Sequence, residues 1–216
     1  MSRRERILRK RYIVFCEGDT EFNYINAMRL NQGVELSIKP INMHGGGYKN
    51  FLDTVKAEAK NNCLAKFIII DYDRVTKHFG EKASLVRLIE YCILQNKIGT
   101  IPHFLIINNP DFEYLACLHI KKYHGQDSKV FIEKDLGFEC IDNLKNKGDI
   151  YDFLNSQGNS FGILLARLKD CNKIIINRYI TSKKYFEINI KESIVDLENS
   201  CIRSSNINEL FEILNW

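Results

Sequence analysis

Few residues in this sequence would divide it into separate domains. Only three of its 216 residues are proline, and neither a glycine- or serine-rich linker nor an internal repeat interrupts it. A chain of this length suits one large domain, or one domain with a substantial appendage. Hydrophobic residues make up 45% and aromatic residues 11% of the chain. That content is enough for a packed core and excludes a disordered chain.

The cysteine pattern excludes a disulfide framework and a zinc knuckle. The seven cysteines are odd in number, form no Cys-x-x-Cys pair and lie mostly among apolar residues, which is typical of reduced thiols. No apolar run approaches the roughly 18 residues that a membrane span needs. The N-terminus lacks the apolar centre of a signal peptide. We therefore expect a cytoplasmic protein with no membrane contact.

Positive charge is concentrated at the start of the chain, although the net charge is only +4. Residues 1–11 form a dense basic arm, which contains Arg3, Arg4, Arg6, Arg9, Lys10 and Arg11. Such an arm commonly contacts phosphates or another acidic surface, and the alternative is a solvated tail that keeps the protein soluble.

From residue 12 onward, strand-like and helix-like segments alternate. The patterns predict strands at 12–16, 35–41, 66–70 and 101–107, and helices at about 20–31, 50–61, 81–96 and 109–122. The last of these helices would begin with Asn109 as its N-cap and Pro110 as its first residue. A succession of βα units predicts an α/β fold with a mostly parallel, Rossmann-like sheet covered by helices.

Acidic residues follow three of the four predicted strands. Glu17 and Glu21 come after the first, Asp71 and Asp73 after the third, and Glu113 after the fourth. Because the carboxyl ends of parallel strands meet at one edge, these side chains should converge. Carboxylates that close together repel unless a cation lies between them or one takes up a proton, and Mg²⁺ or Mn²⁺ is the plainest choice. Taken alone, Asp71-Tyr72-Asp73 is equally compatible with an exposed turn.

Two further features concern substrate binding and the second half of the chain. The glycine run 45–47 precedes a helix and is either a phosphate cradle or a flexible connector. Lys49 beside it and Arg74 after the acids are candidate substrate-binding residues.

Beyond residue 122 we expect a mainly helical extension, 123–216, packed on the core. It contains helical patterns at 148–171 and a strand-like run at 174–176. The basic residues in it and directly before it either line a nucleic-acid path or solvate the surface. They are Lys121, Lys122, Arg167, Lys169, Arg178, Lys183 and Lys184.

Three motifs in the first half of the chain occur together in one known family. They are Glu17-Gly18-Asp19-Thr20-Glu21, Asp71-Tyr72-Asp73 and the segment 109–119, Asn-Pro-Asp-Phe-Glu-Tyr-Leu-Ala-Cys-Leu-His. In this order they resemble the RloB-like proteins, Toprim-domain members associated with bacterial abortive infection and phage defence. The resemblance covers roughly residues 12–122, the expected Toprim-like catalytic core. The family tends to have tryptophan where this chain has Tyr114.

The resemblance implies a Mg²⁺- or Mn²⁺-dependent nuclease that hydrolyses DNA or RNA, with tRNA among the candidates. It implies nucleic acid as partner and a companion defence protein, such as an ATPase or a restriction component, and leaves the oligomeric state open. It assigns Glu17, Asp71 and Asp73 as metal ligands. It assigns Glu21 as a ligand of a second metal or as a base for water, and Glu113 as a further catalytic group. Asn109 and His119 become substrate contacts.

Other classes of function fit less well or stay open. A metal-free nuclease would use histidines as acid and base, but the five histidines form no recognisable pair, and His103 lies in a predicted strand. A receiver domain needs adjacent acids after its first strand and a lysine after its last. A catalytically silent Toprim module that binds nucleic acid or a partner protein remains open.

Overall fold

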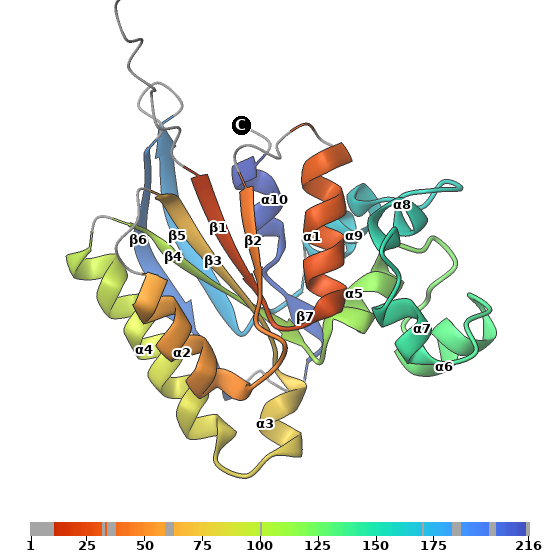
Figure 1. Ribbon diagram of the computed structural model, residues 1–216, viewed down its shortest axis with the longest axis horizontal. Helices are drawn as coiled ribbons and strands as arrows, with labels where there is room; N and C mark the ends of the chain where they lie inside the picture. The colour runs from red at the N-terminus through yellow and green to blue at the C-terminus, as the bar shows by residue number, and fades with distance from the viewer. Residues whose placement is uncertain are drawn as a thin grey trace, which may run out of the picture.

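A five-stranded sheet forms the centre of the protein (Figure 1). The computed structural model describes residues 11–31, 33, 38–58, 63–99, 101–169, 171–182, 187–198 and 202–214. The strand order is β2-β1-β3-β4-β7. These strands are β1 (Arg11–Cys16), β2 (Ile38–Asn42), β3 (Cys63–Asp71), β4 (His103–Asn109) and β7 (Ser204–Ser205). The first four run parallel, and β7 pairs antiparallel with β4.

The central strands are buried on both faces because their side chains alternate between two apolar cores. In β3, Phe67 and Ile69 pack in the core that includes α1 (Asp19–Asn31) and α5 (Phe112–Leu118). Ile68 and Ile70 pack on the other face, against α2 (Gly47–Ala57) and α4 (Glu81–Ile98). The short helix α3 (Asp73–Lys77) follows β3 directly. The predicted α/β fold, a mostly parallel sheet covered by helices, is confirmed.

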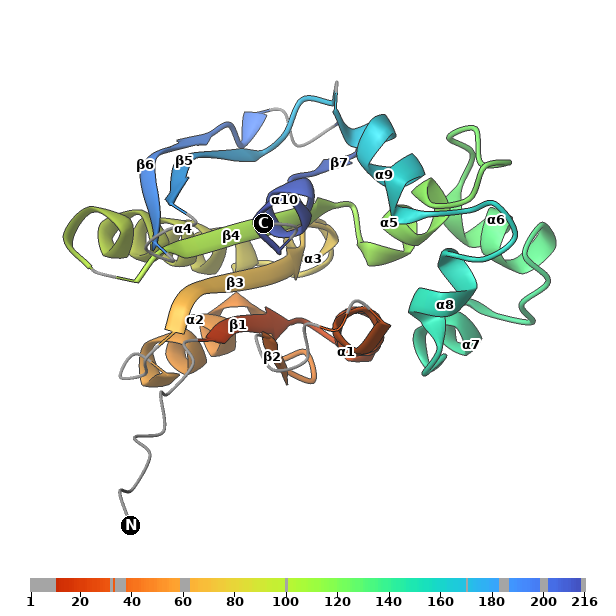
Figure 2. The same ribbon diagram turned by 90° about the horizontal axis from the view of Figure 1, so that it is seen from above.

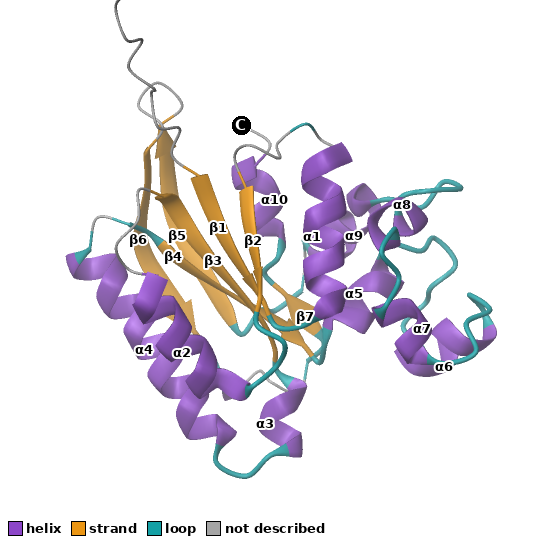
Figure 3. Ribbon diagram, viewed as in Figure 1, coloured by secondary structure: helices purple, strands orange, loops and turns teal. Residues whose placement is uncertain are grey.

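The second half of the chain supplies short helices and a hairpin. The helices are α6 (Ser128–Lys134), α7 (Ile141–Lys145), α8 (Ile150–Leu154), α9 (Phe161–Leu168) and α10 (Asn208–Leu214), of which α6–α9 gather to one side of the sheet (Figure 3). The hairpin of β5 (Ile175–Ser182) and β6 (Glu187–Val195) contacts β4 and α4, at the far side of the sheet from β2 (Figure 2).

The C-terminal segment also completes the main sheet. The side chain of Asn206 accepts a hydrogen bond from the backbone N–H of Ile107 at 2.9 Å and donates one to the carbonyl of Leu105 at 2.9 Å. Both partners are backbone groups of β4, whose edge would otherwise leave them unpaired. The Asn206 side chain therefore makes the hydrogen bonds to the backbone of β4 that a neighbouring strand would otherwise make.

Several local predictions need correction. The helix after β4 does not begin at Asn109, which is the last residue of the strand; Asp111 caps it, accepting a hydrogen bond from the backbone N–H of Tyr114 at 2.9 Å. The helical pattern at 148–171 is two helices, α8 and α9, with a loop between them. The strand-like run at 174–176 extends into a hairpin that the sequence only partly indicated. Of the basic arm only Arg11 is described, and residues 35–37 of the second predicted strand lie outside the described residues.

Arg167 is a further correction, since it neither lines a nucleic-acid path nor simply solvates the surface. Its guanidinium donates to the carbonyl oxygens of Leu118, Ile120, Lys121 and Tyr123, at 2.9 to 3.1 Å. These are the last residue of α5 and the turn after it. Arg167 thereby ties α9 to the end of the helix that carries Glu113. Lys183 and Lys184 lie outside the described residues.

Across the described ranges of the chain, no helix is long and apolar enough to cross a lipid bilayer.

Candidate functional site at the carboxyl edge of the sheet

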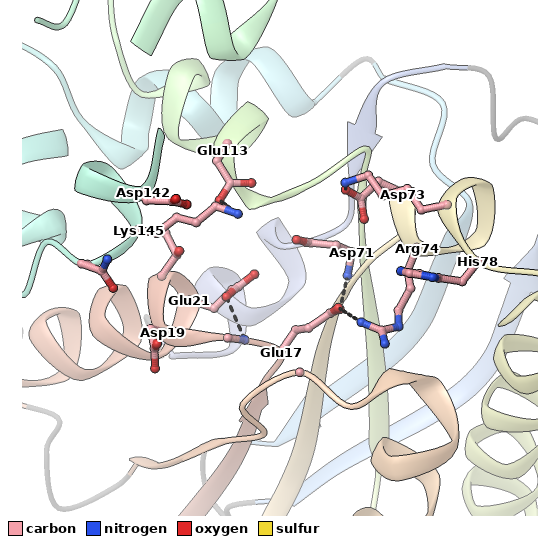
Figure 4. Close-up of a pocket in the computed structure, with 15 residues that line it drawn as sticks. Glu17, Asp19, Glu21, Asp71, Asp73, Arg74, His78, Glu113, Asp142 and Lys145 are labelled. Atoms are coloured by element: carbon pink, nitrogen blue, oxygen red, sulfur yellow. Dashed lines mark hydrogen bonds and ion pairs between the residues drawn. The ribbon is translucent and has the colours of Figure 1, made fainter. Parts of the chain in front are cut away.

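A cavity of about 350 Å³ opens where β1 and β3 end. The five predicted acids line it: Glu17 after β1, Glu21 in the first turn of α1, Asp71 and Asp73 at the end of β3 and the start of α3, and Glu113 in the first turn of α5 (Figure 4). Asp19 of α1 and Asp142 of α7 line it as well. The predicted convergence of acids therefore occurs, because parallel strands bring their carboxyl ends to one edge.

Glu17 is held against the neighbouring strand. Its Oε2 accepts a hydrogen bond from the backbone N–H of Asp71 at 2.9 Å. Its Oε1 lies 3.7 Å from Arg74, whose Nε is 3.4 Å from Glu81. Burial raises the pKa of Glu17, while the bond from Asp71 and the charge of Arg74 lower it. Arg74 was predicted to contact substrate, and here it neutralises two of the protein's own acids.

Asp71 lies on the floor of the cavity and is positioned by β4. The side-chain amide of Asn108 donates to its Oδ1 at 3.0 Å, and Ser205 of β7 donates to the Oδ1 of Asn108 at 2.9 Å. The register explains this contact, because Asp71 pairs with Asn108 across the two strands. From the other side, Tyr48 donates its hydroxyl proton to the Asp71 carbonyl at 2.5 Å.

The sequence motif pointed to Asn109, but Asn108 is the residue that contacts Asp71. Asn109 is buried beside β4, where its side-chain amide donates to the carbonyl of Ile202 at 2.7 Å, and it does not line the cavity. Successive strand residues point to opposite faces, so only one of the two asparagines can face Asp71.

On the opposite wall of the cavity, Glu21 and Glu113 face Lys145 of α7 (Figure 4). Glu21 is almost fully buried and accepts a hydrogen bond from the backbone N–H of Gly18 at 3.1 Å. Lys145 lies 3.4 Å from Glu113. Burial, and then repulsion from Glu113, raise the pKa of Glu21 to about 8. Burial also raises the pKa of Glu113, while the positive charge of Lys145 lowers it.

Asp71 carries the clearest sign of uncompensated charge. Burial raises its pKa well above the usual range, and Glu21, Glu17 and Glu113 raise it further. Asp73, at the first position of α3, is paired with Lys77 one turn later. Acids held in this way are stabilised by an added cation or by a proton.

The donor set fits Mg²⁺ or Mn²⁺ in its chemistry, since these ions prefer carboxylate oxygens and the seven acids of the cavity supply only such oxygens. Within the described ranges, however, no three acidic, histidine or cysteine side chains are arranged to hold an ion as they stand. The reason is visible in the ion pairs: Arg74, Lys77 and Lys145 engage Glu17, Asp73 and Glu113. An ion would have to take over these carboxylates from their present partners.

His119 does not belong to the cavity. It is buried against α1, where Nδ1–H donates to the carbonyl of Leu115 at 2.8 Å and Nε2 accepts from the hydroxyl of Tyr24 at 2.8 Å. A carbonyl can only accept, so the proton must be on Nδ1. Burial lowers the pKa of His119 to about 4. The predicted substrate contact by His119 therefore has no geometric support.

The buried imidazole leads to a pH prediction for His119→Gln. The unfolded chain takes up a proton at this histidine below about pH 6.5, while the folded protein resists until about pH 4, so wild-type stability is lost as the pH falls through this window. The destabilisation caused by His119→Gln should therefore shrink by about 2 kcal/mol between pH 7 and 5. Urea unfolding at both pH values measures it, with the exposed His124→Gln as the baseline. A loss that is equal at both pH values would contradict a neutral buried imidazole.

The glycine run is not a free phosphate cradle. Gly45 lines the cavity, and Gly46 and Gly47 have φ values of +93° and +78° that only glycine adopts easily. The N–H of Tyr48 at the start of α2 donates to the carboxylate of Glu81 at 3.2 Å, so the protein's own acid occupies the position expected for a phosphate. Lys49 is exposed and does not line the cavity.

Sequence reasoning missed Asn108, Lys145 and Asp142. Asp142 and Lys145 come from α7, in a region without a recognisable motif, and both line the cavity. No local pattern marks them, because α7 reaches the site only through its packing beside α1 and α6. For Asn108 the signal was available, since it follows the strand in the same way as Asp71.

Comparison with known proteins gives a single distant likeness to report. No protein-family model matches the chain, and no curated protein matches it. The C-terminal region of the Burkholderia pseudomallei OLD protein is similar in structure, with a TM-score of 0.42 and 15% identity, over 75% of this chain and 98% of that one. A likeness this distant says nothing about activity, and the resemblance to RloB-like proteins remains a prediction.

Proposed function

We propose that this protein is a Mg²⁺- or Mn²⁺-dependent nuclease that hydrolyses phosphodiester bonds in nucleic acid. The observation that carries the proposal is the gathering of seven carboxylates, the five predicted ones among them, around one cavity at the carboxyl edge of the sheet. Raised pKa values in four of them, Glu17, Glu21, Asp71 and Glu113, mark charge that the fold does not fully compensate. Such clusters of perturbed acids are concentrated at functional sites.

The acids divide into two groups by position. Glu17, Asp71 and Asp73 are the proposed ligands of a first ion, and Glu21 and Glu113 would serve a second ion or the attacking water. When bound, the metal would stabilise charge on the phosphate and ease deprotonation of water. The pKa of Glu21, about 8, lies near the range in which a carboxylate accepts a proton from water at neutral pH.

The basic side chains of the site have a proposed role in receiving substrate. Lys77 and Lys145 are 63% and 43% exposed, so both can turn from their acid partners toward an incoming phosphate. Arg74 is more enclosed and bridges Glu17 and Glu81. We assign Arg74 to holding the acids in place and the two lysines to offsetting the charge of the substrate.

The direct test is an assay of wild type and Glu17→Gln on plasmid, single-stranded DNA and tRNA, with Mn²⁺, with Mg²⁺ and with EDTA. We expect wild type to cut at least one substrate only with metal, and Glu17→Gln to lose about a thousand-fold in rate. Asp53→Asn, an exposed acid on α2, is the matched control and should keep full activity. Cleavage that persists in EDTA would refute metal dependence.

A catalytically silent module that binds nucleic acid is the second candidate. The ion pairs that already engage Glu17, Asp73 and Glu113 favour it, because they leave no ready metal position among the described residues. Salt-sensitive binding without cleavage of any substrate would support this module over the nuclease. On the resemblance to RloB-like proteins, we place either activity in antiphage defence, with a companion ATPase or restriction component.

A further inference from the structure

One large apolar side chain next to the cavity has no packing role. Phe79 has a relative exposure of 111%, the highest among the large hydrophobic side chains of the described residues. It follows directly on Lys77 and His78, which both line the cavity. An exposed phenylalanine gives up roughly 2–3 kcal/mol that burial would supply. The Phe79 ring is not part of the apolar core, so the exposed position of this ring needs another explanation.

The backbone holds Phe79 outward at the apex of a tight turn. The N–H of Glu81 bonds to the carbonyl of His78 at 3.3 Å, which closes a four-residue turn around Phe79 and Gly80. Gly80 has φ +89° and ψ −14°, the values of the third position in a type II turn. Phe79 is therefore the second residue of that turn, where a side chain points into solvent.

The base of the turn is anchored to the site. Glu81 is paired with Arg74 at 3.4 Å, and Arg74 is paired with Glu17 at 3.7 Å. Glu81 also accepts the N–H of Tyr48 from α2. The turn that carries the ring is therefore anchored through Glu81 to Arg74, and Arg74 also contacts Glu17, a proposed metal ligand.

The residues on either side of Phe79 in the chain are cationic and polar. Lys77 and Lys82, two residues before it and three after it, are both exposed, and His78 directly before it lines the cavity. An aromatic face flanked by cations is the arrangement that binds unstacked bases and their phosphates in single-stranded nucleic acid, where stacking contributes about 1–3 kcal/mol per base. A continuous duplex offers no free base face to such a ring.

We propose that Phe79 stacks on an unpaired base beside the scissile phosphate, so that the substrate is a single-stranded segment, loop or frayed end. This inference rests on the proposed function for its choice of nucleic acid as the ligand. It adds a binding residue outside the acidic cluster and a substrate class that the acids do not specify. Because Phe79 makes no core contact, its substitution should leave the fold intact.

Binding of labelled short oligo(dT), oligo(rU) and a blunt duplex, in EDTA to prevent cleavage, tests this assignment. Phe79→Ala and Phe79→Leu should weaken binding of both single strands about 10-fold, whereas Phe79→Tyr should bind within about two-fold of wild type. Duplex binding should not change in any variant. Leucine is the matched control, since it keeps apolar bulk without an aromatic face.

A second measurement detects stacking without reference to activity. In a Trp216→Phe background, which removes the chain's single tryptophan, Phe79→Trp should show quenched fluorescence on addition of oligo(dT). Unchanged fluorescence, unchanged affinity of Phe79→Ala, or an equal loss on duplex would each overturn the proposal.

The outcome separates this inference from the nuclease proposal. If wild type cleaves with Mn²⁺ but Phe79→Ala binds and cleaves single strands as wild type does, the stacking role fails and the nuclease stands. If no substrate is cleaved while Phe79 is needed for single-strand binding, the nuclease fails and the stacking role stands.

Discussion

Asp71→Asn is expected to slow metal-dependent cleavage severely and yet to stabilise the metal-free fold. The carboxylate faces Glu17, Glu21 and Glu113, and its pKa is raised well above the usual range by burial and by these three neighbours. Replacing it with a neutral amide of the same shape removes that repulsion. The amide oxygen can still accept the hydrogen bond that Asn108 donates at 3.0 Å. The two effects therefore have opposite signs.

The expected magnitudes make both effects measurable. Cleavage should fall about a thousand-fold, since a charged group at the reacting phosphate is lost. Without metal, the melting temperature of the variant should lie above that of wild type, because burial no longer has to hold a charge against three neighbouring acids. Melting curves in EDTA and in Mn²⁺ measure the stability, and a rate assay on the preferred substrate measures the activity.

Metal should reverse the order of stability. A ligand at a hundred times its dissociation constant stabilises the folded state by about 2.7 kcal/mol, so Mn²⁺ should raise the melting temperature of wild type and leave Asp71→Asn nearly unchanged. Asp53→Asn on the exposed face of α2 controls for the loss of one surface carboxylate. A variant that melts below wild type in EDTA would mean that the charge of Asp71 is already compensated, and equal Mn²⁺ shifts in both proteins would remove Asp71 from the metal site.

Arg167→Met is expected to produce the largest loss of stability among the basic residues discussed. The guanidinium donates to four backbone carbonyls at the end of α5. Without it these acceptors lose a charged donor, and three of the four bonds are partly shielded from water. We expect a loss of about 3–4 kcal/mol, or about 10 °C in melting temperature.

Two further variants sharpen this prediction. Arg167→Lys should recover only part of the loss, because an ammonium group cannot span four carbonyls as a planar guanidinium does. Arg178→Met removes an exposed arginine that pairs with Glu192 at 3.2 Å, and it should cost less than about 1 kcal/mol. Equal effects of Arg167→Met and Arg178→Met on the melting temperature would show that the four bonds contribute little.

Most of the sheet was predictable because its signals are local. The apolar run before Asp71 marks a strand that is buried on both faces, and alternating strand and helix patterns determine a parallel sheet with few alternatives. In such a sheet the carboxyl ends share an edge, so the acids after β1, β3 and β4 had to meet. The hairpin of β5 and β6 was harder to predict, since only the short apolar run at 174–176 indicated a strand in this region.

The tertiary structure was needed wherever a contact joins segments that are distant in the chain. Strand register places Asn108, and not Asn109, on Asp71. The packing of α7 brings Lys145 to Glu113, and the packing of α9 brings Arg167 to the end of α5. Local patterns do not encode the offsets between elements, so no motif could assign these partners.

The sequence by itself determined that the acids after β1, β3 and β4 gather at one edge of the sheet, because hydrophobic periodicity specifies strands and parallel strands align their ends. Only the tertiary structure revealed that Glu17, Asp73 and Glu113 are paired with basic side chains, that His119 is buried away from the cavity, and that Phe79 projects beside it. Side-chain pairing and exposure depend on how elements pack against one another, and that packing is a property of the whole chain.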